Sequence, residues 1–185
     1  MQIETQAYLD LLEETHKICF FDIEATGLRG DYNSILCISV KPYGLKPVTF
    51  KVERPGHDRK VLKDAVECLE SFHVWTSYYG RGFDIPMINT RRLRWGDEPV
   101  DKRPHLDLYF SLKAKLLTAR KSQGHLLAWL GTPESKMTVS ATVWSEILAE
   151  PAKHMPMMIK RCESDCAGLE ALYKRTKHLI AEISR

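Results

Sequence analysis

The chain has 185 residues, of which 44% are hydrophobic and 28% are charged, the balance of an ordinary globular domain. No apolar stretch approaches the ~20 residues of a membrane-spanning helix, and the N-terminal segment lacks the pattern of a signal peptide, so membrane and secretory classes are excluded. The five cysteines are odd in number and lack Cys-x-x-Cys spacing, which argues against a disulfide framework or a zinc site and favours a cytoplasmic location. We expect a single domain over residues 1–185.

The net charge of +3 is unevenly distributed along the chain. Residues 1–34 contain seven acids and two bases, a net charge of −5, so the remainder carries +8. The basic residues cluster at positions 91–94, 113–121, 160–161 and 174–178. Basic clusters around an acidic centre suit a polyanion held beside metal ions, although solvated helix faces give similar counts.

The N-terminal part of the chain predicts one helix and three strands. Residues 5–16 are expected to form a short amphipathic helix with Tyr8, Leu9, Leu11 and Leu12 on its buried side. Three strand candidates follow, separated by short turn signals, which favours an antiparallel meander. They cover residues 17–24, 34–41 and 47–53.

The first of these strands carries two carboxylates one residue apart. Asp22 and Glu24 follow an apolar run, and alternation along a strand points both side chains to the same face. Two like charges beside apolar neighbours cost free energy unless a cation joins them, and hard oxygen ligands suit Mg²⁺ or Mn²⁺. The alternative interpretation is an edge strand whose acids point into water.

The rest of the chain predicts two further strands and several helices. A helix over residues 59–72, with apolar residues at helical spacing, lets a fourth strand at 74–79 run parallel to the first. Further elements are expected at 84–95 (helix), near 105–108 (strand), at 122–130 and 140–148 (helices), and from Met155 or Met157 to Ile183 (helix). The predicted fold is one α/β domain with a mixed sheet, an antiparallel meander followed by parallel strands, flanked by helices.

Two more acids occupy positions that suit either a structural role or metal binding. Asp84 follows a Gly-x-Gly turn at the start of a helix, where an aspartate is also a favoured N-cap. Asp165 falls within the apolar stripe of the last helix, where a buried acid needs a partner. A pair with Arg161 at i,i+4 on a partly exposed flank is the alternative for Asp165.

Three segments in this order resemble the exonuclease motifs of the DEDD (DnaQ-like) 3′–5′ exonucleases, which have an RNase H-like fold. They are FDIEATGL, YYGRGFDIP and RCESDCAGL. The exonuclease domains of family B DNA polymerases and small stand-alone phage-type enzymes are the most similar members. The resemblance extends from Lys17 to about Arg175.

The resemblance implies roles for individual residues. Asp22, Glu24, Asp84 and Asp165 would be the metal ligands and catalytic acids for two divalent ions, Mg²⁺ or Mn²⁺. The substrate-binding residues would be those that abut the terminal nucleotide, namely Thr26, Gly27, Leu28 and Phe83.

The chain departs from the family pattern at one catalytic position. Arg161 stands where the family has a Tyr or His four residues before the last acid. Arginine stays protonated, so it cannot be a general base, and we expect it to contact phosphate instead. Either the metal alone would then generate the hydroxide, or another group would serve as the base, with His154, His105 and Tyr173 as candidates; a slow or inactive nuclease is the third alternative. His105 and Asp107 are expected beside the site, with Asp107 capping the next helix.

These inferences predict a two-metal 3′–5′ exonuclease that releases nucleoside monophosphates from DNA ends, with single strands preferred. The alternatives are an exoribonuclease of the same superfamily and a non-catalytic module that binds nucleic acid or assists a polymerase, the latter favoured by Arg161. The expected partners are nucleic acid and a replication or repair polymerase, with no membrane association.

Overall fold

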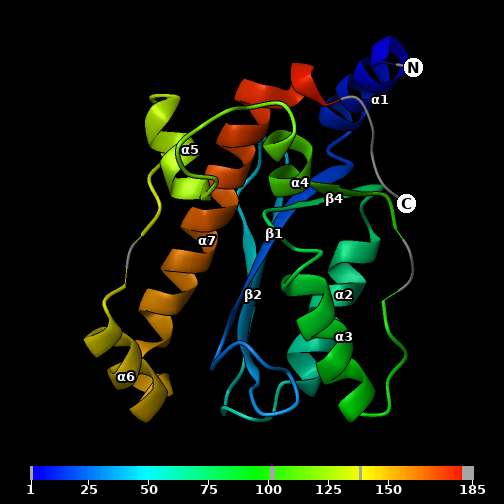
Figure 1. The fold of residues 1–185 in the computed structure, drawn as a ribbon. Coiled ribbons are helices and arrows are strands. Elements are labelled where there is room, and N and C mark those ends of the chain that lie inside the picture. The colour runs from blue at the N-terminus through cyan, green and yellow to red at the C-terminus, as the bar shows by residue number, and fades with distance from the viewer. Residues whose placement is uncertain (1, 101–102, 138, 181–185) are drawn as a thin grey trace.

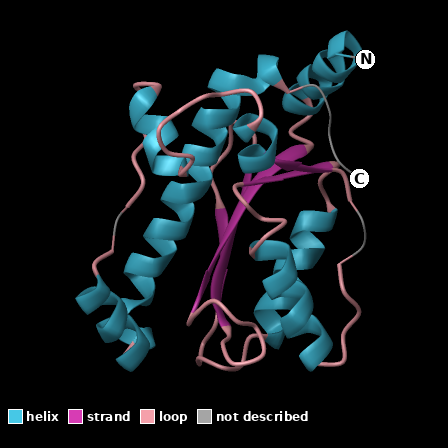
Figure 2. Ribbon diagram, viewed as in Figure 1, coloured by secondary structure: helices cyan, strands magenta, loops and turns pink. Residues whose placement is uncertain are grey.

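The structure is a computed structural model that describes residues 2–100, 103–137 and 139–180. A central sheet is flanked by helices (Figures 1 and 2). The strands are β1 (Ile18–Ala25), β2 (Ile35–Pro42), β3 (Val48–Lys51), β4 (Val74–Ser77) and β5 (His105–Asp107). The helices are α1 (Gln2–Glu14), α2 (Arg59–Glu70), α3 (Asp84–Arg94), α4 (Leu108–Lys113), α5 (Gln123–Trp129), α6 (Ala141–Ala149) and α7 (Pro151–Thr176), followed by a 3-10 turn at Lys177–Leu179.

The sheet has the order β3-β2-β1-β4-β5. β1 pairs antiparallel with β2, and β2 pairs antiparallel with β3, so the first three strands form the expected meander. β4 pairs parallel with β1, and β5 pairs parallel with β4. The acidic pair therefore lies on the central strand, with Asp22 opposite Ser39 and Glu24 opposite Cys37 of β2. The interpretation of this strand as a solvent-facing edge is wrong.

Helices cover both faces of the sheet (Figure 1). α7 crosses one face over β1 and β2, while α2 and α3 pack together against the other face. The buried residues of α2 are apolar residues at helical spacing, as expected for this helix: Val61, Leu62, Ala65, Val66 and Leu69. The apolar stripe predicted for α7 is also buried, from Met155 and Met158 through Cys162, Cys166 and Leu169 to Tyr173, with Asp165 inside it. The sequence therefore predicts the layer structure correctly.

Several element boundaries differ from the predictions. β3 and β4 are shorter than expected, ending at Lys51 and Ser77. α7 begins earlier than expected, at Pro151, and the predicted end at Ile183 lies outside the described residues. Among the residues of α1 whose burial is described, Leu9 and Leu12 are buried, whereas Tyr8 and Leu11 are exposed. The expected four-residue buried side of this helix is therefore wrong: α1 lies at one end of the sheet (Figure 1), and two of the four predicted residues are exposed.

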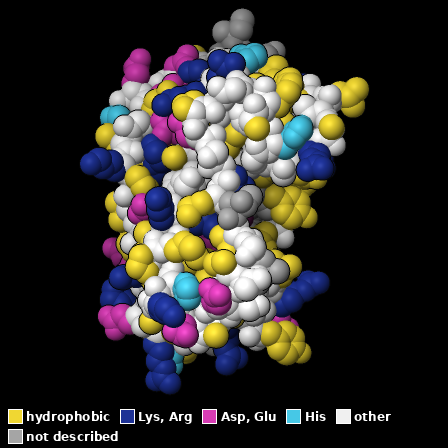
Figure 3. Space-filling view, turned by 90° about the vertical axis from the view of Figure 1, so that its left-hand side faces the viewer, with side chains coloured by type: hydrophobic (Ala, Val, Ile, Leu, Met, Phe, Trp, Pro, Cys, Tyr) yellow, Lys and Arg dark blue, Asp and Glu magenta, His cyan; other side chains and the backbone are white. Residues whose placement is uncertain are grey.

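The surface and the thiols add two further observations. Lys and Arg side chains are intermixed with acids on the face that carries α5, α6 and α7, rather than gathered into one field (Figure 3). The five cysteines are free thiols, and four of them are buried. Among the described residues, no helix has the length and apolar character needed to cross a membrane.

Candidate active site

Asp22, Glu24 and Asp165 meet at the contact between β1 and α7. One carboxylate oxygen from each residue lies within 4.8 Å of the other two. Alternation along β1 turns Asp22 and Glu24 toward the face that α7 covers, and Asp165 lies on the buried side of that helix. The Cys162 thiol donates a hydrogen bond to the backbone oxygen of Asp22 over 3.2 Å. This hydrogen bond joins α7 to β1 about one helical turn before Asp165.

Asp84 enters the same pocket from the start of α3. It is the first residue of the helix, the N-cap position belongs to Phe83, and no side-chain cap hydrogen bond forms there. The interpretation of Asp84 as an N-cap is therefore wrong. Burial and the nearby charge of Asp22 raise the pKa of Asp84 well above its usual value. The structure thus places all four predicted acids around one pocket.

The electrostatics of this cluster favour a bound cation. Burial, followed by repulsion from neighbouring acids, raises the pKa of both Asp22 and Glu24. Glu24 Oε1 and Asp165 Oδ1 are buried and have no hydrogen-bond partner. Buried carboxylate oxygens need a compensating charge or donor, and divalent Mg²⁺ or Mn²⁺ supplies it through oxygen coordination. The donor set therefore fits a divalent metal centre.

Two cations already neutralise part of this acidic cluster. Arg161 Nη1 lies 2.6 Å from Glu24 Oε2, and Lys136 Nζ lies 3.0 Å from Asp165 Oδ2. The Arg161 guanidinium also lies over the Trp144 ring, 5.5 Å from its centroid. The alternative pairing of Arg161 with Asp165 is therefore wrong, because the arginine bridges to β1 instead. Lys136 was not predicted, since its segment carries no periodic pattern.

The pocket around the acids has a volume of about 480 Å³, within the range of about 300–1,000 Å³ typical of small-molecule sites. Thr26, Gly27, Leu28 and Phe83 all line it, as the resemblance implied. α6 contributes Trp144 and Leu148 to the lining.

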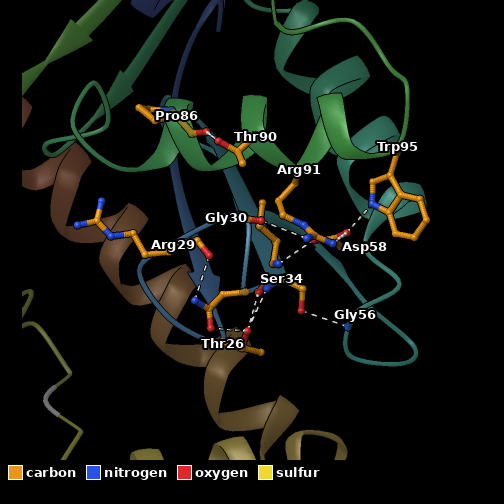
Figure 4. A network of polar contacts seen from close by, with 12 residues as sticks. Thr26, Arg29, Gly30, Ser34, Gly56, Asp58, Pro86, Thr90, Arg91 and Trp95 are labelled. Atoms are coloured by element: carbon orange, nitrogen blue, oxygen red, sulfur yellow. Dashed lines mark hydrogen bonds and ion pairs between the residues drawn. The ribbon is translucent and has the colours of Figure 1, made fainter.

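A buried ion pair holds the loop that follows β1 (Figure 4). Asp58 has no exposed surface and accepts hydrogen bonds from Arg91 Nε at 2.8 Å, from Trp95 Nε1 at 2.7 Å and from the Ile35 backbone N–H at 2.9 Å. Arg91 in turn donates to the backbone oxygen of Gly30 over 3.2 Å. These contacts fix the loop to α3 and β2, and residues Thr26–Leu28 at the start of this loop line the pocket.

The same loop is closed on itself by hydrogen bonds to Thr26. The Thr26 N–H donates to the Ser34 backbone oxygen, and the Ser34 N–H donates to Thr26 Oγ1. A Cβ added at Gly27 would overlap the Asn33 side chain. Glycine at this position therefore lets the loop pack closely beside the pocket.

Asp107 organises the turn on the opposite side of the pocket. It caps α4 by accepting from the Tyr109 N–H, as predicted, and it also accepts from the Tyr79 and Arg81 N–H groups at 2.9 and 3.0 Å. His105 shares a 2.8 Å hydrogen bond with Ser77 Oγ and does not line the pocket.

The remaining candidates for a general base are also outside the pocket. Tyr173 is buried and donates to Glu13 over 2.7 Å. His154 lies on α7 nearly two turns before Arg161, and neither His154 nor Tyr173 belongs to the pocket lining. These placements contradict the suggestion that His154, His105 or Tyr173 deprotonates a nucleophilic water.

Comparisons with known proteins fit this geometry. A search of curated proteins finds no match. Among solved structures, a family B DNA polymerase from the hyperthermophilic archaeon Pyrobaculum calidifontis superposes with a TM-score of 0.70 at 17% identity. The alignment covers 86% of this chain and 24% of the polymerase, so the chain corresponds to about a quarter of that protein. At this identity the likeness establishes the fold. A model of the RNase H superfamily matches residues 19–177, nearly the whole chain including all four acids, and the chain therefore belongs to the RNase H superfamily.

Proposed function

We propose that this protein is a metal-dependent 3′–5′ exonuclease of the DEDD (DnaQ-like) type that acts on single-stranded DNA ends. Membership of the RNase H superfamily supports nuclease activity in general. The finer proposal rests on one observation: four acids converge on one pocket, namely Asp22, Glu24, Asp84 and Asp165. The cationic side chains of Arg161 and Lys136 lie in the same pocket. We further propose that the protein acts in the cytoplasm together with a replication or repair polymerase.

The acids would hold two divalent ions. Ions bound there would lower the pKa of the attacking water and offset the charge that develops on the phosphate and the leaving oxygen. Water attacks the terminal phosphorus, the bond from phosphorus to the 3′ oxygen of the preceding nucleotide breaks, and a proton ends on that oxygen. The products are a nucleoside 5′-monophosphate and a strand shortened by one nucleotide.

The other pocket residues would bind and orient the substrate. Arg161 and Lys136 are the cations nearest the acids, and both suit contacts to the non-bridging oxygens of the scissile phosphate. Leu28 and Phe83 offer apolar contacts to the terminal base, and such contacts tolerate every base. A pocket of this volume suits one nucleotide, which favours cleavage at an end rather than within a strand.

The test uses matched single-stranded DNA and RNA labelled at the 5′ end. Each is incubated with Mg²⁺, with Mn²⁺ and with EDTA, and the Asp22→Asn variant is the control. We expect a metal-dependent ladder of products that shorten from the 3′ end, absent in the control. A faster ladder with RNA would identify the protein as an exoribonuclease. Internal cuts, or cleavage unaffected by EDTA, would contradict the proposal.

The two ion pairs favour a second candidate, a non-catalytic module that binds nucleic acid ends. Arg161 and Lys136 each occupy one oxygen of an acid that would bind metal. If they stay there, the protein would bind strand ends without cutting them. Binding of labelled DNA without cleavage in either metal would favour this candidate.

A further inference from the structure

Beside the pocket lies a cluster of aromatic rings and cations that the proposed chemistry does not use. We call it the Tyr79–Phe110 surface, and it consists of Tyr79, Arg81, Tyr109, Phe110 and Lys113. The Tyr79 and Phe110 rings stack at 22° with centroids 5.7 Å apart. Tyr109 meets both rings edge-on, at 5.0 Å from Tyr79 and 5.2 Å from Phe110.

Two cations lie over this aromatic cluster. Lys113 Nζ is 4.5 Å from the Phe110 centroid and 5.7 Å from that of Tyr109, and the Arg81 guanidinium is 6.0 Å from Phe110. Both cations are exposed, and neither has an ion pair to an acid within the described part of the chain. They are therefore available to an external anion.

Backbone hydrogen bonds to Asp107 hold this cluster in place. The buried Asp107 carboxylate accepts from the N–H groups of Tyr79, Arg81 and Tyr109, which joins the turn after β4 to the start of α4. Tyr79 has φ of 64°, a left-handed conformation that is unfavourable for a non-glycine residue. A Cβ added at Gly82 would overlap the Tyr79 ring, so the glycine leaves room for that ring.

The Tyr79 side chain connects this surface with the pocket. Tyr79 lines the pocket that holds the four acids, yet 46% of its surface is exposed. Phe110, Tyr109 and Lys113 do not line the pocket and extend the aromatic surface away from it. A tyrosine that served only to fill the core would be buried, so strain and exposure together indicate a ring presented to a ligand.

We propose that the Tyr79–Phe110 surface binds the nucleotides that precede the terminal one in a single strand. The base next to the terminal one would stack on Tyr79, which lines the pocket, and earlier bases would stack on Phe110, so a dinucleotide would not reach the Phe110 ring. The backbone phosphates would bind Arg81 and Lys113. Stacking on aromatic rings combined with cations along the backbone is the general mode of binding single strands without sequence preference. The proposal rests on the proposed function, because the pocket must receive the end of the same strand.

The test compares binding of a long strand with cleavage of a short one. Binding of fluorescein-labelled decathymidylate is measured by anisotropy in EDTA, and cleavage of a thymidine dinucleotide is measured with Mn²⁺. We expect Phe110→Leu to weaken decathymidylate binding about tenfold, the loss typical of one stacked base, and to leave kcat/KM for the dinucleotide unchanged. Phe110→Trp should restore tight binding, because it keeps an aromatic face.

Phe50 of β3 provides a matched control, since it is also a partly buried phenylalanine and lies on the opposite edge of the sheet. Phe50→Leu should leave decathymidylate binding unchanged. Lys113→Gln should reduce the slope of log affinity against log salt by about 1, as expected for one lost phosphate contact.

The outcomes separate this proposal from the proposed function. If Phe110→Leu binds decathymidylate as tightly as the wild-type protein and still cleaves the dinucleotide, the proposed binding surface is contradicted. The proposed exonuclease activity is then still supported. Equal loss of dinucleotide cleavage, or failure of Phe110→Trp to restore binding, would also overturn it by indicating a structural role. If the wild-type protein cleaves nothing but its strand binding depends on the aromatic ring of Phe110, the surface is supported and the exonuclease is contradicted.

Discussion

Arg161 Nη1 lies 2.6 Å from Glu24 Oε2, so a helix side chain already neutralises one of the acids that would bind metal. The second oxygen of the same carboxylate, Oε1, is buried without a partner. A divalent ion that uses both oxygens must therefore displace the guanidinium. Under the proposed function, the displaced Arg161 would stand beside the scissile phosphate. The arginine would then compete with the metal for Glu24 and also help to bind the substrate.

Replacement of Arg161 by alanine is expected to change metal binding and substrate binding in opposite directions. Arg161→Ala should lower the Mn²⁺ concentration for half-maximal activity about fivefold, a coupling of ~1 kcal/mol. It should raise KM about tenfold, since a hydrogen bond to a charged group contributes about 1.5 kcal/mol. Titration of activity with Mn²⁺ and with substrate measures both effects.

Lys160 offers the matched control for this change, because it precedes Arg161 on α7 and is exposed. Lys160→Ala should leave both quantities near their wild-type values. A variant Arg161→Ala that alters neither the metal requirement nor KM would show that the Glu24 pair has no part in either step.

Removal of one acid is expected to stabilise the metal-free protein while abolishing cleavage. Burial and repulsion raise the pKa of Asp22, so its charge opposes folding. Asp22→Asn should therefore raise the melting temperature in EDTA by about 2–4 °C for each kcal/mol relieved. The same variant should lose the increase in melting temperature that Mn²⁺ gives the wild-type protein. A lower melting temperature in EDTA would mean that Asp22 is fully compensated without metal.

The buried pair between Asp58 and Arg91 should be the costliest ion pair to break. Asp58→Asn leaves the Arg91 guanidinium buried without a counter-charge, which costs about 3–5 kcal/mol. Urea unfolding measures this loss. Asp97→Asn is the control, because it breaks the exposed pair with Arg59 and should have little effect. Similar stability of the two variants would contradict the role of Asp58 in fixing the loop.

Acid pH is also expected to act on the Asp58 pair. Although burial alone raises the pKa of Asp58, hydrogen bonds from Arg91, from Trp95 and from the backbone of Ile35 lower it below its usual value. An acid with a lowered folded-state pKa stabilises the protein above its unfolded-state pKa of about 4. This stabilisation should disappear as the pH falls through the folded-state value.

His105 predicts a second pH dependence, in a milder range. Burial lowers the pKa of His105 to about 4, compared with about 6.5 in the unfolded chain. Between these values the unfolded state binds more protons, so stability rises with pH and falls as the pH is lowered. Between pH 7 and pH 5 the histidine should account for a loss of about 2 kcal/mol.

The His105→Asn variant isolates this contribution. Urea unfolding in EDTA at pH 5, 6 and 7 should show a smaller fall in stability for the variant than for the wild-type protein. Identical curves would mean that the imidazole becomes protonated without disturbing its hydrogen bond to Ser77.

The sequence predicts the layers well because burial dictates periodic patterns. The stripe of α2 and the stripe of α7, including Asp165, follow helical spacing and are buried as expected. The alternation that places Asp22 and Glu24 on one face of β1 depends only on strand geometry. These features are local, so the order of residues is sufficient to predict them.

The missed residues depend on contacts between distant segments. Lys136 reaches Asp165 from a stretch between α5 and α6 that has no periodic pattern. Trp144 reaches the pocket because α6 packs at the beginning of α7. The alternative pairing of Arg161 with Asp165 was wrong for the same reason. Helical spacing favours Asp165, whereas the fold brings Glu24 closer to the arginine. Pairings of this kind appear only once the helices are placed against the sheet.

The position of Asp165 on the last long helix has a consequence for protein synthesis. Asp22, Glu24 and Asp84 emerge from the ribosome before α7, which spans Pro151–Thr176 and carries Asp165. N-terminal segments fold first during synthesis, so a growing chain holds three of the acids without the fourth, and without Arg161. Because Asp165 follows the other three acids along the chain, the complete set of four acids, and with it the proposed nuclease activity, would form only after α7 has been synthesised.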